Sequence, residues 1–102
     1  MNLELHHNEF IDYLKGEKNA SHYTIDNYTS DFKQFIIFLS SNGIQSKFGA
    51  VTTPIVRRYI AYLKCDKNYS TCTIRRRIHS IIIHFYSFIN FKHLKLLTFH
   101  NF

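Results

Sequence analysis

Apolar residues recur with the period of an α-helix in four separate stretches of this chain. Each such period places an apolar stripe on one face of a helix, and these stripes must be buried against one another. Residues typical of helix ends stand where the period begins or stops. Ser21 is a suitable N-cap, Pro54 is suited to the first turn of a helix, and Gly43 is suited to the position after a helix. Strand signals are weak throughout. The pattern predicts an all-α fold, with helices from Leu3 to about Lys15, from Ser21 to Ser41, from Thr52 or Thr53 to the turn DKNYS, and from Ser70 to Ile89.

The fourth stretch, STCTIRRRIHSIIIHFYSFI at 70–89, is at once the most apolar and the most basic. On a helical projection Arg76 lies almost opposite the apolar stripe, and Arg75 and Arg77 flank it. With Ser70 or Thr71 as N-cap, three guanidinium groups lie near a helix start that is already positive, and a bound phosphate would relieve this arrangement. The alternative is a solvated basic face. The predicted stripe consists of Ile74, Ile78, Ile81, Ile82, Phe85, Phe88 and Ile89.

Composition indicates one globular domain with a polarised charge. The chain has 102 residues, 45% of them hydrophobic, and a formal net charge of +6. Residues 1–51 carry four basic and six acidic groups, whereas residues 52–102 carry nine and one. A basic surface favours nucleic acid, anionic lipid or an acidic protein. No apolar run approaches the roughly 20 residues of a spanning helix, and the acidic N-terminus has no signal-peptide core, so we expect a cytoplasmic protein without membrane insertion.

The candidate ligand residues predict no metal or cofactor. Cys65 and Cys72 could pair across a helix-turn-helix corner, but free thiols are expected in a chain without a leader. The seven histidines form no His/Cys set of zinc spacing.

The predicted helices carry a recognisable series of motifs: FIDYLKGEKNAS and YTIDNYTSDFKQFIIFL, then VTTPIVRRYIAYL, then YSTCTIRRRIHSI and FYSFI. In this order and spacing the series resembles the N-terminal core-binding (SAM-like) domain of the tyrosine recombinase, or phage integrase, family, including its Xer and Cre relatives. The resemblance covers about residues 8–90. It implies a four-helix orthogonal bundle that clamps one face of a duplex DNA half-site. Residues 1–90 would form this DNA-binding domain, and 91–102 a tail or the remnant of a linker to an absent catalytic domain.

The resemblance also nominates site residues at the starts of the second and fourth helices. Arginine can pair with phosphate or grip a guanine edge, and asparagine can do the same for adenine. The threonines could instead bond their own helix backbone. The nominated DNA contacts are Thr24, Asn27, Thr73, Arg75, Arg76 and Arg77.

The chain departs from the family pattern in two respects. Ile82, Ile83 and His84 stand where relatives commonly place a basic residue in the fourth helix. Nothing matches the family's catalytic arginines, histidine and tyrosine nucleophile, so we expect no strand cleavage by this chain alone. The expected role is to position DNA in recombination and integration, as a monomer in the absence of DNA. The alternatives are a helical protein-interaction module with a basic face, and an enzyme that requires residues beyond Phe102.

Overall fold

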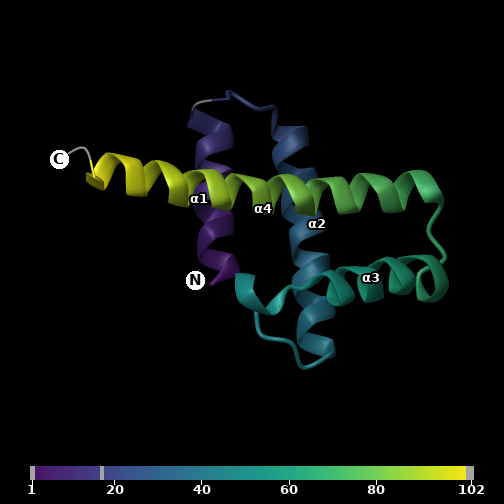
Figure 1. Cartoon of the computed structure of the whole chain (residues 1–102). Helices are drawn as coiled ribbons and strands as arrows, with labels where there is room; N and C mark the ends of the chain where they lie inside the picture. Colours follow the sequence, from purple (N-terminus) through teal and green to yellow (C-terminus); the bar gives the residue numbers. More distant parts are fainter. Residues whose placement is uncertain (1, 17, 101–102) are drawn as a thin grey trace.

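The helices form two pairs that cross each other. The computed structural model describes residues 2–16 and 18–100, with side-chain surroundings up to residue 87. Helices α1 and α2 lie side by side, α4 crosses both of them, and α3 runs alongside the first half of α4 (Figure 1). No strand occurs in the described part, which confirms the all-α prediction. The elements are α1 (Leu3–Gly16), α2 (His22–Ser41), the 3₁₀ turn η1 (Phe48–Ala50), α3 (Thr53–Ala61), the π-type turn η2 (Tyr62–Asp66) and α4 (Thr71–His100).

Local capping chemistry fixes where the helices begin and end. The Ser21 hydroxyl accepts the backbone N–H of Thr24 at 3.1 Å, and the Ser70 hydroxyl accepts that of Thr73 at 3.2 Å. Both contacts satisfy a donor that has no partner inside the helix. Gly43 adopts φ 69° after the end of α2, in the left-handed region that glycine enters without a steric penalty. The predicted caps are therefore confirmed.

The core is centred on α2, which contacts α1 on one flank and α4 across its face. Phe35 and Leu39 of α2 are fully buried with Tyr59 of α3, Leu63 of η2 and Leu3 of α1. A smaller cluster of Phe10, Leu14 and Ile25 joins α1 to the start of α2. Burial of this aromatic and aliphatic surface supplies the main driving force that holds the crossed helices together.

Helix α4 is longer than the predicted fourth helix. It continues from Thr71 to His100, about ten residues past the predicted end at Ile89. No glycine or proline interrupts residues 71–100, so nothing in the sequence breaks the helix. The side chains of Phe88 and Ile89, the last two members of the predicted stripe, lie outside the described residues. The side chains of the predicted tail, residues 91–102, also lie outside them.

The buried face of α4 is rotated from the predicted stripe. Ser80 and His84, which the pattern placed outside the stripe, are only 7% and 3% exposed, whereas Ile82 is 58% exposed. The prediction that Ile82 lies in the core is therefore wrong. Because α4 crosses two helices, its orientation depends on what those helices present. Asp31 of α2 pairs with Arg76 and Arg77, and His7 of α1 meets His84.

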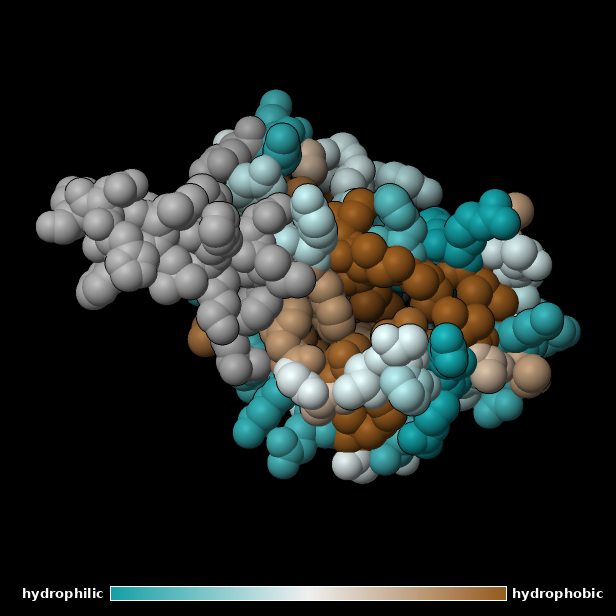
Figure 2. All heavy atoms as spheres, in the orientation of Figure 1, coloured by the Kyte–Doolittle hydropathy of each residue, from teal (hydrophilic) through white to brown (hydrophobic). Residues whose placement is uncertain are grey.

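The rotation leaves an apolar groove between α3 and α4. Its volume is about 240 Å³, and hydrophobic surface is visible there at the centre of the space-filling view (Figure 2). Ile82 and Tyr86, at 58% and 66% exposure, form its rim on α4. The groove is lined by Phe35, Val56, Tyr59, Ile78, Ile81, Ile82, Phe85 and Tyr86.

Candidate nucleic-acid interface

The two nominated threonines occupy equivalent places at the starts of α2 and α4. In addition to the backbone contacts above, the Ser21 and Thr24 hydroxyl oxygens are 2.9 Å apart, and the Ser70 hydroxyl donates to the Thr73 hydroxyl at 3.1 Å. Each threonine is half-buried. Their hydroxyls thus belong to the helix caps, and any contact with an external anion would have to share them with Ser21 or Ser70.

Asn27 lies one turn beyond Thr24 on the same side of α2. Residues three apart on a helix are neighbours on its surface. Asn27 is half-buried, and its amide makes no hydrogen bond to another residue of the described part. This side chain is available to a ligand that approaches the start of α2.

The three consecutive arginines of α4 have three different environments. Arg75 is exposed and forms no ion pair with any described residue. Arg76 is half-exposed and donates from Nη1 and Nη2 to the two carboxylate oxygens of Asp31 on α2, at 2.8 and 3.2 Å. Arg77 is only 14% exposed, and its Nη1 lies 3.8 Å from the same carboxylate. Its guanidinium carbon lies 4.9 Å from the centre of the Tyr69 ring, within cation–π range.

Arg76, predicted to lie almost opposite the apolar stripe, is exposed over half of its side chain, but its guanidinium turns to a carboxylate of α2. Asp31 lies in the middle of α2 with 2% of its side chain exposed, and it draws both Arg76 and Arg77 toward α2. A buried carboxylate is tolerated only when it is paired, and two guanidinium groups satisfy that requirement. Of the nominated arginines, Arg75 is exposed, Arg76 is half-exposed and Arg77 is largely buried.

Sequence reasoning missed Asp31. A signal existed, because Asp31 falls at helical spacing among Tyr28, Phe32 and Phe35 on the apolar face of α2. A carboxylate in such a stripe requires a cationic partner from another helix. The fourth helix offers three arginines beside its own apolar stripe, and the third helix offers two.

Two other arginines lie on α3. Arg58 donates to the side-chain oxygen of Asn42 at 2.8 Å, and the Asn42 amide in turn donates to the carbonyl of Phe38. Arg58 therefore ties α3 to the end of α2. Arg57 is exposed.

Of the three residues at which α4 departs from the pattern of the resemblance, Ile82 is exposed, Ile83 is half-buried and His84 is buried. The His84 ring stacks on Phe32, and its Nε2 lies 3.2 Å from Nδ1 of His7 on α1. Burial, and then the neighbouring histidines, lower the pKa of His84 to about 3. Burial, with His6 and Lys33 nearby, lowers the pKa of His7 to about 4. These rings are neutral at physiological pH, so His84 is a core residue and offers no charge to DNA.

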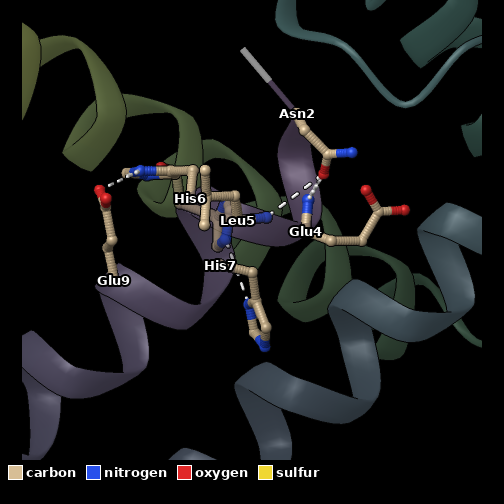
Figure 3. A network of polar contacts seen from close by, with 7 residues as sticks. Asn2, Glu4, Leu5, His6, His7 and Glu9 are labelled. Atoms are coloured by element: carbon tan, nitrogen blue, oxygen red, sulfur yellow. Dashed lines mark hydrogen bonds and ion pairs between the residues drawn. The ribbon is translucent and has the colours of Figure 1, made fainter.

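His6, adjacent to His7 in α1, completes this buried cluster. Its Nε2 lies 3.3 Å from the backbone carbonyl of His84, and its Nδ1 lies 4.0 Å from Glu9 (Figure 3). Burial lowers its pKa also. Within the described residues no group of three or more His, Cys, Asp or Glu side chains is arranged to hold a metal ion. Cys65 and Cys72 are free and exposed.

Comparison with known proteins identifies the family. Residues 8–90 match the phage integrase, N-terminal SAM-like domain. Over 73 residues, 72% of the chain, it is 42% identical to tyrosine recombinase XerC of Natranaerobius thermophilus and covers 24% of that protein. Over 87 residues, 85% of the chain, it is 38% identical to tyrosine recombinase XerC of Oceanobacillus iheyensis and covers 28% of that protein. No solved structure matches the chain.

The chain therefore belongs to the phage integrase N-terminal SAM-like domain family. The predicted family and fold class, an all-α SAM-like integrase domain, are both confirmed. The chain spans about a quarter of the length of the curated relatives it matches, and the match lies in the N-terminal domain. No helix in the described part of the chain has both the length and the apolar character needed to cross a membrane.

Proposed function

We propose that this domain binds duplex DNA as the core-binding domain of a tyrosine recombinase. The observation that carries the proposal is the start of α4, where Arg75 and the accessible part of Arg76 sit beside a serine-capped helix N-terminus. Backbone N–H groups at a helix start and guanidinium groups both favour phosphate. Nine of the thirteen basic residues fall in residues 52–102, against one acidic residue, so the field around this helix is positive.

The proposed DNA-contacting residues have different roles, which follow from their side-chain chemistry. Arg75 would neutralise a phosphate, because it is exposed and unpaired among the described residues. Arg76 and Asn27 carry donor groups that can also read the edges of guanine and adenine in the major groove. Thr73 would serve as a weaker phosphate donor that shares its hydroxyl with Ser70. Arg77 supports the site from within the fold.

We assign the domain a positioning role in recombination and integration, in partnership with a recombinase catalytic domain. The curated relatives bear the name tyrosine recombinase, and this chain matches only their N-terminal part. Its most buried tyrosine, Tyr59, is 1% exposed, and burial raises its pKa to about 12, which makes it a poor nucleophile. The domain would hold one face of a half-site while strand cleavage takes place in the partner domain.

Fluorescence anisotropy with a short, labelled duplex of mixed sequence, at several salt concentrations, tests the proposal. Each lost phosphate contact reduces the slope of log K against log salt by about one unit, so Arg75→Ala/Arg76→Ala is expected to reduce it by about two. The control, Lys33→Ala/Lys47→Ala, removes the same charge from exposed positions outside α4 and leaves the slope nearly unchanged. Equal slopes for all three proteins would refute DNA binding through the start of α4.

A second candidate function is supported by the apolar groove between α3 and α4. Exposed Ile82 and Tyr86 at its rim are typical of surfaces that bind another protein. In this alternative the domain is a helical protein-interaction module with a basic face. Weak DNA binding without salt dependence, together with a partner captured through the groove and lost in Ile82→Glu, would favour it.

A further inference from the structure

The ion cluster formed by Asp31, Arg76 and Arg77 carries an unbalanced charge. Two guanidinium groups and one carboxylate leave a formal charge of +1. Asp31 is 2% exposed and Arg77 is 14% exposed, whereas Arg76 is 50% exposed. The surplus positive charge therefore reaches solvent mainly through Arg76. An isolated charge of this kind near a protein surface attracts an anion.

The bonds of Arg76 leave one edge of its guanidinium free. Nη1 donates to Oδ2 of Asp31 and Nη2 donates to Oδ1, so the two bonds use one N–H of each terminal nitrogen. A guanidinium has five N–H donors, and three remain. The Nε–H and one Nη–H point along the same side edge, which matches two phosphate oxygens or the O6 and N7 of guanine. Arg76 can thus bind Asp31 and a nucleotide acceptor pair together.

We propose that Asp31 is a positioning residue for DNA binding: it holds the Arg76 guanidinium so that its free side edge faces the duplex. This inference rests on the proposed DNA-binding function. Arginine has many rotamers, and ordering such a side chain during binding lowers affinity. The contact between α2 and α4 orders Arg76 in the free protein, and burial of Asp31 keeps water from competing for the carboxylate.

The Asp31→Asn substitution distinguishes a positioning role from a purely electrostatic one, because the two predict opposite changes in DNA affinity. The substitution removes a negative charge from a DNA-binding surface, and long-range electrostatics alone would strengthen binding. Loss of the ordered Arg76 would instead weaken binding by about three- to tenfold. The matched control is Asp26→Asn, which removes the same charge from an exposed position of the same helix. Asp26→Asn is expected to bind as tightly as the wild type, or more tightly.

Anisotropy titration of a labelled, mixed-sequence duplex with the full chain provides the test, and thermal melting followed by circular dichroism verifies folding of each variant. Asp31→Asn is expected to weaken binding, and to cause no further weakening in an Arg76→Ala background, because Asp31 acts through Arg76. Binding by Asp31→Asn that equals or exceeds that of Asp26→Asn overturns the positioning role.

A second variant covers the case in which Asp31→Asn does not fold. Arg76→Lys keeps the charge and the buried carboxylate but cannot bind two acceptor pairs at once. It is expected to bind DNA more weakly than the wild type but more tightly than Arg76→Ala, which also lacks the charge, and wild-type affinity for Arg76→Lys refutes the inference. The two proposals fail differently. If Arg75→Ala/Arg76→Ala leaves the salt slope unchanged, DNA binding itself is wrong. If that slope falls while Asp31→Asn binds like Asp26→Asn, only the positioning role is wrong.

Discussion

Acidification is expected to unfold this domain through its buried histidines. His7 and His84 are 7% and 3% exposed, with pKa values lowered to about 4 and about 3. In the unfolded chain the pKa of histidine is about 6.5, so below that pH the unfolded state binds protons that the folded state excludes. The stabilisation from keeping these rings neutral is fully present above about pH 6.5 and is lost as the pH falls toward 4.

The size of the effect follows from proton linkage. Each excluded proton lowers the free energy of unfolding by about 1.4 kcal/mol per pH unit, so two histidines give about 2.7 kcal/mol per unit. Between pH 6.5 and 4.5 the loss is about 5 kcal/mol, comparable with the total stability of a small domain. His6, whose pKa is also lowered, adds to the slope in the same direction.

Urea denaturation across this pH range measures the slope. His84→Leu is expected to reduce it by about 1.4 kcal/mol per pH unit, because one excluded proton is removed. The control is His22→Gln, which is expected to leave the slope unchanged. The His22 side chain is already 92% exposed in the folded protein, so unfolding does not expose it further. A free energy of unfolding that stays constant between pH 7 and 5 in the wild type would refute the burial argument.

Three further predictions concern stability and separate structural from surface residues. Arg77→Ala should lower the free energy of unfolding by about 3 kcal/mol in urea melts, because it leaves the buried Asp31 carboxylate with one cationic partner fewer. Arg75→Ala should change the free energy of unfolding by less than about 0.5 kcal/mol. Equal effects of the two substitutions would contradict the environments assigned to these arginines. Ser70→Ala should cost about 1 kcal/mol through loss of the α4 cap, and Ser70→Gly should recover most of this. Gly43→Ala should cost about 1 kcal/mol in the same assay because φ is 69° there, and an unchanged midpoint would argue against that turn.

The helices and their caps could be predicted because they depend on neighbours in sequence. Ser21 and Ser70 cap the helices that follow them, and Gly43 ends α2, as short-range rules require. The end of α4 was predicted less well. The predicted apolar stripe has its last member at Ile89, but a helix without breakers continues whether or not its apolar residues align.

The buried face of α4 could not be obtained from its own period. Ile82 outranks Ser80 and His84 in hydropathy, yet it is the exposed member of the three. The choice is made by residues far away in sequence: Asp31 on α2 draws in Arg76 and Arg77, and His7 on α1 meets His84 at 3.2 Å. A projection of one helix contains no information about such partners, and buried polar groups fix an orientation because few arrangements satisfy them.

The same partners make the basic site smaller than its sequence suggests. Three consecutive arginines at a helix start predict three phosphate contacts and a salt slope of about 2.7 from this helix. With Arg77 only 14% exposed and committed to Asp31 and Tyr69, Arg75 and Arg76 remain, and the expected contribution falls to about 1.8. Comparison of Arg75→Ala/Arg76→Ala with the triple variant that adds Arg77→Ala, under conditions where both are folded, measures the difference. If the salt slope of the triple variant is lower by a further full unit, Arg77 leaves Asp31 to bind DNA. The Asp31, Arg76 and Arg77 cluster would then supply DNA contacts directly and would not serve only to position Arg76.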